Sequence, residues 1–247
     1  FGAALAGKLM GKPVYYHVHE TSLTPASFKM FLRFIVQKTA SKVIFVSKSV
    51  ADAESFANIP QAVIYNALPG DLAKVAEINQ YEYKSGESFN VLMICSLKVY
   101  KGVEEFLRVA ELCEVHKKIA FTLVLNAEQS ELDAYFVNRV LPSNITLVPR
   151  QNNLIPYYKK ASLVLNLSRV DEWVETFGLT IIEAMAFGIP VIVPPVGGPA
   201  EIVRDAEEGY LISSYKVDKI AETIVNIYKN EKLCMALSIA ARKRVED

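Results

Sequence analysis

The feature that most constrains the fold of this chain is a regular alternation of short apolar segments with longer amphipathic ones from Val91 onward. The short apolar runs are VLMIC, FTLVLN, ITLVP, LVLNLS, PVIVPP and YLIS. Continuous apolar runs of this length are typical of parallel strands buried on both faces, and the segments between them have a helical period. The pattern predicts an α/β fold with a doubly wound parallel sheet and right-handed crossovers.

The first seventy residues show the same alternation but contain only three strand-like segments, VYYHVHE, KVIFVS and AVIYN. Three strands are too few to build a sheet with both faces covered by helices. The polar stretch that follows has a glycine near each end, and we interpret it as a linker between domains. The predicted division is 1–70 for the first domain, 71–88 for the linker and 89–247 for the second domain.

Composition limits the functional classes. Lysine plus arginine and aspartate plus glutamate are equal at 27 each, so no excess of positive charge favours nucleic acid as a partner. Cys95, Cys113 and Cys234 are scattered and lack metal-ligand spacing, which is typical of buried thiols in a reducing compartment. No apolar stretch approaches the roughly 18 residues that span a bilayer, and no signal peptide is recognisable. We expect a cytoplasmic protein and, because the chain starts at Phe1 and stops within a helical pattern, a fragment.

The strongest functional signal lies in residues 172–203, where Glu175 and Glu183 stand on either side of a loop that leads into a helix. The apolar residues from Thr180 onward suit a helix that lies on a sheet. The backbone N–H groups of residues 176–178 would point out of its first turn, where they and the helix dipole favour a phosphate. Two carboxylates around such a site suit a ligand with a central diphosphate and hydroxyls at both ends, as in a nucleotide sugar.

A glutamate before a helix and another within it also occur in many helices without special function. Here, however, the segment resembles the signature of retaining glycosyltransferases of the group 1 type, glycosyltransferase family 4. The resemblance covers both glutamates, T-F-G-L, the run E-A-M-A-F-G-I-P-V and the following G-G-P-A-E. It implies the GT-B fold, with two Rossmann-like domains of which the N-terminal one is incomplete. It also implies a nucleoside-diphosphate sugar as donor and a glycan or lipid-linked acceptor, without a cofactor.

A second motif is the loop SLKVYKGVEEF, in which Lys98 and Lys101 precede a helix that begins after Gly102. Cations and free amides that face one point suit a diphosphate, although two lysines in a loop are more often solvated surface. Family members usually carry an arginine where Ser96 stands here. We therefore expect Lys101 to make the main phosphate contact and regard Lys98 as a candidate replacement for that arginine.

A third motif is YYHVHE at a strand end, where alternation would send His17 and His19 to the same side. A histidine at such a position is commonly structural. The family resemblance implies a histidine–glutamate pair near the transferred sugar, which assigns that role first to His19 and then to Glu20.

The resemblance further implies that Glu183 binds the ribose, that Glu175 binds the donated sugar and that the backbone of Pro149–Arg150 meets the base. The predicted catalytic residues are Glu175, Lys101 and His19. The predicted donor-binding residues are Lys98, Lys101, Pro149, Arg150, Glu175, Thr176, Phe177, Gly178, Leu179 and Glu183.

Several alternatives stay open at this point. A nucleotide-sugar epimerase of GT-B shape would share the diphosphate site, and a non-catalytic sugar-nucleotide-binding module would share both the site and the fold. No Asp-x-Asp motif is present, so nothing indicates a metal-dependent GT-A transferase, and no metal site is predicted. The apolar helix at 28–38 carries three cations. It either covers the first sheet or lies on the inner face of the cytoplasmic membrane.

Overall fold

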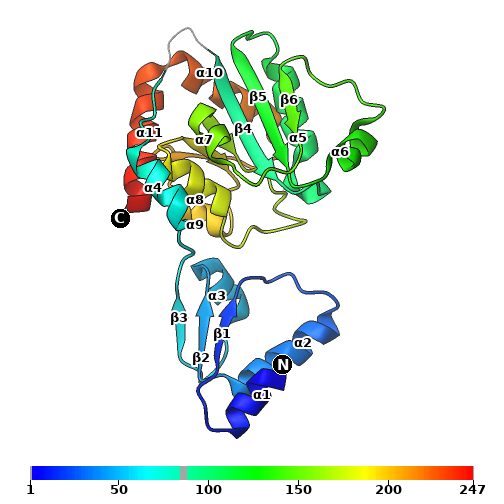
Figure 1. Cartoon of the computed structure of the whole chain (residues 1–247), viewed down its shortest axis with the longest axis vertical. Helices are drawn as coiled ribbons and strands as arrows, with labels where there is room; N and C mark the ends of the chain where they lie inside the picture. Colours follow the sequence, from blue (N-terminus) through cyan, green and yellow to red (C-terminus); the bar gives the residue numbers. More distant parts are fainter. Residues whose placement is uncertain (1, 84–87, 247) are drawn as a thin grey trace. The chain divides into compact units, whose positions relative to one another are not determined.

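The structure is a computed structural model that describes residues 2–83 and 88–246. The chain forms two compact units, which we describe separately (Figure 1). The smaller unit comprises Phe1–Ala67 and Glu175–Phe177, and the larger comprises Leu68–Val174 and Gly178–Asp247.

The smaller unit contains a three-stranded parallel sheet in the order β1-β2-β3. Helix α3 packs against β2, and α1 packs against α2 (Figure 1). Val43, Phe45 and Val50 are almost completely buried and form the centre of its core. The three predicted strands are therefore present. Their bounds and those of the helices are α1 Gly2–Leu9, β1 Tyr15–Val18, α2 Ala26–Thr39, β2 Lys42–Phe45, α3 Lys48–Glu54 and β3 Gln61–Val63.

The larger unit contains a six-stranded sheet in which every neighbouring pair is parallel, as predicted. The strand order is β6-β5-β4-β7-β8-β9, which is the 3-2-1-4-5-6 order of the doubly wound dinucleotide-binding fold. The order reverses between β4 and β7, which are direct neighbours. The strands are β4 Phe89–Cys95, β5 Ile119–Leu125, β6 Ile145–Val148, β7 Leu163–Leu165, β8 Val191–Val193 and β9 Gly209–Leu211.

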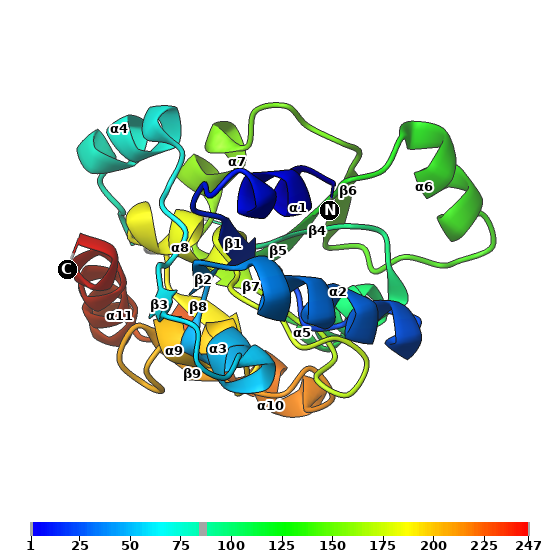
Figure 2. The same cartoon turned by 90° about the horizontal axis from the view of Figure 1, so that it is seen from below.

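Helices cover both faces of this sheet (Figures 1 and 2). On one face α5 packs against α10, and on the other α8 packs against α11 and α4. Their inner faces are apolar at helical spacing, so each helix buries a stripe against the strands. The helices are α4 Gly70–Ile78, α5 Val103–Cys113, α6 Gln129–Phe136, α7 Ile155–Lys160, α8 Leu179–Ala186, α9 Gly198–Ile202, α10 Val217–Lys229 and α11 Glu231–Glu246, with a short 3-10 helix at Val99–Lys101.

The predicted linker at 71–88 needs correction. Its first residues belong to helix α4, whose Leu72 and Ala76 are buried in the larger unit. The guanidinium of Arg242 in α11 donates hydrogen bonds to the carbonyl oxygens of Ala76 (3.0 Å) and Asn79 (2.5 Å). Two turns with only two buried apolar positions give a weak helical pattern, and contact with α8 and α11 stabilises them. Residues 84–87 of the predicted linker lie outside the described residues.

Within the part of the chain that the structure describes, no helix combines the length and the apolar character that crossing a membrane requires.

Candidate functional site

The strand order of the larger unit indicates where a ligand would bind. In open α/β sheets, ligands lie beyond the carboxyl ends of the strands at the point where the strand order reverses. Here that point is between the ends of β4 at Cys95 and of β7 at Leu165. The loops at 96–102 and 166–174 open at this edge, and the first contains one of the predicted motifs while the second leads toward another.

Gly102 allows these two loops to come into contact. Its φ of +78° lies in the left-handed region, and it ends the short 3-10 helix and starts α5. A Cβ atom at this position would lie 2.1 Å from the carbonyl oxygen of Leu167, just beyond β7. Any other residue would both strain the backbone and push the two loops apart. The close approach therefore requires glycine.

Lys101, the residue before this glycine, is half-buried at the edge of the sheet. Its Nζ lies 5.8 Å from the ring centroids of Tyr100 and Trp173, and these two rings stack at 5.1 Å with an interplanar angle of 21°. Burial raises the pKa of the Cys95 thiol to about 12, while the positive charge of Lys101 acts in the opposite direction. The predicted cation thus lies at the end of β4, beside aromatic rings from both loops, whereas Lys98 is exposed.

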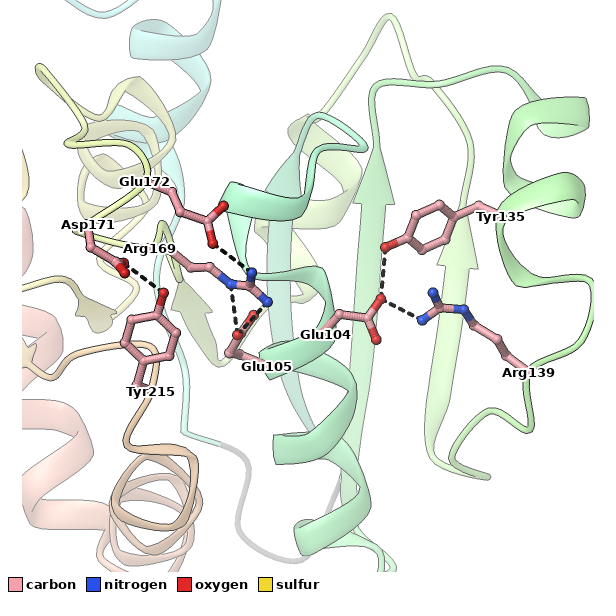
Figure 3. Close-up of polar contacts among 8 residues, drawn as sticks. All are labelled: Glu104, Glu105, Tyr135, Arg139, Arg169, Asp171, Glu172 and Tyr215. Atoms are coloured by element: carbon pink, nitrogen blue, oxygen red, sulfur yellow. Dashed lines mark hydrogen bonds and ion pairs between the residues drawn. The ribbon is translucent and has the colours of Figure 1, made fainter. Parts of the chain in front are cut away.

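Arg169 joins the two loops to the start of α5 (Figure 3). Its backbone N–H donates to the carbonyl oxygen of Tyr100 (2.8 Å), and its own carbonyl oxygen accepts from the N–H of Trp173 (2.8 Å). Its guanidinium binds Glu105 through Nε at 2.9 Å and Nη2 at 2.8 Å, and Glu172 through Nη1 at 2.9 Å. These hydrogen bonds, to Glu172 and then Glu105, raise the pKa of Arg169. Arg169 therefore remains a cation that holds the site together.

The loop after β7 is also held at a second point, where the hydroxyl of Tyr215 donates to Asp171 at 2.7 Å (Figure 3). This contact connects the loop to the segment that follows β9. Tyr215 is 50% exposed, so this hydrogen bond lies at the protein surface.

Helix α8 begins where the signature motif predicts an anion site. Gly178 precedes the first helical residue with a φ of +105°, and a Cβ atom there would lie 2.6 Å from Cδ1 of Ile181. The carbonyl oxygen of Gly178 accepts from the N–H of Ile181 (3.0 Å), which closes the first turn. The amides of the first turn then point along the helix axis toward the loop, with the positive end of the helix dipole. Leu179 is exposed there.

Glu183 lies one turn further along α8 and is half-buried. Its Oε2 accepts a hydrogen bond of 2.6 Å from the hydroxyl of Tyr158 in α7. Burial raises the pKa of Glu183, and the hydrogen bond from Tyr158 partly opposes this shift. The hydrogen bond from a neighbouring helix therefore sets the direction of this acidic side chain.

Three other predicted residues of the signature, Glu175–Phe177, belong by their contacts to the smaller unit. Glu175 and Thr176 are half-buried and Phe177 is buried. His17 and His19 lie in the same unit, and their ring centroids are 4.1 Å apart, in agreement with the alternation along β1. Both histidines are exposed, as is the neighbouring Glu20, so none of them is a core residue.

Pro149 and Arg150 follow β6 and are tied to the loop after β5. The N–H of Arg150 donates to the carbonyl oxygen of Ala127 at 2.9 Å, and its Nε donates to Oδ1 of Asn126 at 2.7 Å. The carbonyl oxygen of Pro149 accepts from the side chain of Gln151 at 3.1 Å. The amide of Arg150 is therefore already used within the protein, and a base would have to meet other backbone groups of this stretch.

Three contributors to the site were missed by the sequence analysis, namely Arg169, its partner Glu105, and Tyr158. An arginine after an apolar strand and a tyrosine in a short helix are common, and their partners lie 64 and 25 positions away. Only the order of the strands brings them together.

Solved structures of similar shape are numerous. HepE from Anabaena, solved in complex with UDP and glucose, aligns with a TM-score of 0.80 at 20% identity, covering 99% of this chain and 69% of HepE. Sucrose-phosphate synthase from Thermosynechococcus elongatus aligns with a TM-score of 0.74 at 19% identity, covering 99% of this chain and 66% of that protein. These similarities confirm the predicted α/β fold of the GT-B type.

Curated relatives match shorter segments. Sucrose synthase 2 from Tulipa gesneriana is 28% identical over 133 residues, which are 53% of this chain and 16% of that protein. N-acetyl-alpha-D-glucosaminyl L-malate synthase from Bacillus anthracis is 30% identical over 108 residues, which are 44% of this chain and 27% of that protein. The chain thus matches only a minor part of the length of these relatives.

The sequence pattern of one protein family, described as glycosyl transferases group 1, matches residues 76–244. The matched region contains β4 to β9 and both loops of the candidate site. Because the match covers more than half of the sequence, this chain belongs to the group 1 glycosyl transferase family.

Proposed function

We propose that this protein transfers a sugar from a nucleoside-diphosphate sugar to a hydroxyl group of a glycan or lipid-linked acceptor, with retention of the anomeric configuration. The observation that carries the proposal is the meeting of two loops at the reversal of the strand order. There the contact of Gly102 with Leu167 brings the loop of Lys101 against the loop that leads into α8. UDP is the first nucleotide to test, because HepE was solved with UDP and glucose.

In this proposal Lys101 and the backbone amides of Phe177, Gly178 and Leu179 hold the diphosphate. A lysine acts as a point charge on phosphate oxygens, and the first turn of α8 offers N–H donors and a positive dipole end. The same groups would stabilise the negative charge that develops on the leaving phosphate in the transition state. Thr176 lies in the same stretch, and Lys98 is a secondary candidate for a phosphate contact.

The hydroxyl groups of the donor are assigned to carboxylates. Glu183 would accept hydrogen bonds from the ribose, and Glu175 from the donated sugar. The backbone of Pro149–Arg150 would meet the base, and His19 would donate a hydrogen bond to a hydroxyl of the transferred sugar.

Retention can be written without a covalent intermediate. The bond between the anomeric carbon and the β-phosphate oxygen breaks as the acceptor oxygen attacks the anomeric carbon on the same face. The acceptor proton passes to the departing phosphate oxygen, and the nucleoside diphosphate is released. No divalent ion is required in this scheme, because Lys101 and the α8 amides supply the charge stabilisation.

Binding to the full chain tests the donor site most directly. We would titrate UDP-, GDP- and ADP-sugars and follow unfolding of the larger unit. A donor at 100 times its Kd should raise the free energy of unfolding by about 2.7 kcal/mol. Lys101→Ala should weaken this effect strongly, whereas Lys117→Ala, which removes an exposed lysine before β5, should leave it unchanged.

Two results would contradict the proposal. The first is that none of the nucleotide sugars stabilises the protein. The second is that Lys101→Ala and Lys117→Ala bind the donor equally well. Release of the nucleoside diphosphate only after an acceptor is added would distinguish transfer from epimerisation.

A further inference from the structure

Tyr158 lies beside the proposed ribose-binding carboxylate. It is in α7, between β6 and β7, and only 1% of it is exposed. Its hydroxyl donates to Oε2 of Glu183 at 2.6 Å. A bond of this length from a neutral hydroxyl to a carboxylate belongs to the strong, charge-assisted class.

The ring of Tyr158 is itself fixed in place. It stacks on Phe187 with centroids 5.5 Å apart and an interplanar angle of 21°. Phe187 is fully buried and follows Glu183 by one turn at the end of α8. Because the ring is rigid and packed, its hydroxyl has one position, and that position is next to the carboxylate.

The remaining capacity of the carboxylate matches a diol. A carboxylate offers about four acceptor directions on its two oxygens. Tyr158 occupies one of them on Oε2 and leaves the others for two hydroxyl donors. A glutamate that is already oriented loses less side-chain freedom when the ligand binds, so orientation in the free protein increases affinity.

We propose that Tyr158 is a positioning residue that holds the carboxylate of Glu183 in the direction in which it accepts hydrogen bonds from the ribose of the donor nucleotide. This inference rests on the proposed function, because it requires Glu183 to bind ribose. It adds that recognition of the ribose depends on a hydroxyl from a different helix, which does not itself contact the ligand.

A purely structural explanation makes a different prediction. A buried tyrosine hydroxyl needs a partner, and Glu183 could serve only as that partner. In that case loss of the hydroxyl would alter stability but not the preference for ribose over deoxyribose. The two explanations are therefore separated by ligand selectivity rather than by stability.

The test uses Tyr158→Phe, which retains the stacked ring and removes only the hydroxyl. Tyr135→Phe is the matched control, because the hydroxyl of Tyr135 also donates to a glutamate, Glu104, at 2.8 Å but on the exposed side of α5 (Figure 3). UDP, GDP and ADP would be titrated calorimetrically against the full chain. The tightest binder would then be compared with its 2′-deoxy and 3′-deoxy forms.

We expect Tyr158→Phe to bind the ribonucleotide about 10-fold more weakly, while binding of the deoxy forms changes little. The variant loses the hydrogen bond to the charged Glu183, and the loss of such a bond typically corresponds to a factor of about 10. The preference for ribose should therefore fall. Tyr135→Phe should keep the preference of the wild-type protein. In Glu183→Gln the preference should be lost, and adding Tyr158→Phe to it should cause no further loss.

The outcomes separate the two proposals. If none of the three nucleotides binds the wild-type protein, the proposed function is wrong. If Glu183→Gln loses the ribose preference but Tyr158→Phe retains it, the proposed function stands and the role of Tyr158 is wrong. If Tyr158→Phe does not fold, Phe187→Leu, which removes the ring stack but keeps the hydroxyl, should lower the ribose preference, and an unchanged preference would overturn the inference.

Discussion

Two adjacent glutamates at the start of α5 provide an internal comparison of buried and exposed ion pairs (Figure 3). Glu105 binds Arg169, and the two side chains are only 10% and 16% exposed. Glu104 binds Arg139, and those side chains are 36% and 38% exposed. Both pairs join an arginine to a glutamate, but the pair of Arg169 and Glu105 is more deeply buried. We expect very different consequences when each arginine is replaced by methionine.

The expected loss of stability follows from the unpaired glutamate charge that each substitution leaves behind. Arg169→Met would leave the carboxylate of Glu105 buried, and its Oε2 already has no hydrogen-bond partner among the described residues. Removing one partner of a buried pair costs roughly 3–5 kcal/mol, and the slight exposure of this pair places our expectation near the lower end, at about 3 kcal/mol. Arg139→Met should cost less than about 1 kcal/mol, because solvent screens the exposed pair.

Urea unfolding and thermal unfolding of the larger unit, both monitored by circular dichroism, measure the two effects. For a unit of this size, about 3 kcal/mol corresponds to a fall in Tm of roughly 6–12 °C. Replacing both partners, in Arg169→Met with Glu105→Leu, should recover most of the stability, since no unpaired charge then remains buried.

The reasoning would be refuted if the two arginine variants were equally stable. It would also be refuted if the double variant were as unstable as Arg169→Met alone, because the loss would then come from packing or from the contact with Glu172 rather than from the buried charge.

Three further predictions concern the site. Gly102→Ala should weaken donor binding and lower Tm, because its Cβ would collide with Leu167, whereas Gly70→Ala, with no atom within 4 Å, should do neither. Nucleotide titrations should show that donor affinity falls as pH decreases through the raised pKa of Glu183, since the protonated carboxyl group has fewer acceptor positions. In Tyr158→Phe this fall should occur at higher pH, because the hydrogen bond that lowers the pKa of Glu183 is lost. EDTA should leave the rate of sugar transfer unchanged in an assay of nucleotide release. Loss of activity in EDTA that Mn²⁺ restores would contradict this.

The fold of the larger unit could be predicted because its strands are buried on both faces. Such strands appear as continuous apolar runs, and the crossover rules then leave few topologies. Helix α4 was missed for the opposite reason. Its nine residues are too few to form a stable helix in isolation, and Leu72 and Ala76 gain their burial from contact with distant parts of the chain.

The site was only partly predictable. Lys101 and Glu183 lie in motifs that can be recognised along the chain, and the structure places Lys101 in the short helix after β4 and Glu183 one turn into α8. Arg169 and Tyr158 have no such local pattern. Their roles depend on which strands are neighbours and on how closely Gly102 lets the two loops approach.

The sequence by itself determined the alternation of strands and helices, the motif with two glutamates and the positive charge of the loop at 96–102. These features depend on residue type and on spacing over a few turns, which a linear pattern contains. The tertiary structure alone decided that β4 and β7 are neighbours, that Arg169 joins their loops and that Tyr158 meets Glu183. Those contacts join residues far apart in the chain, and their geometry exists only once the core is packed.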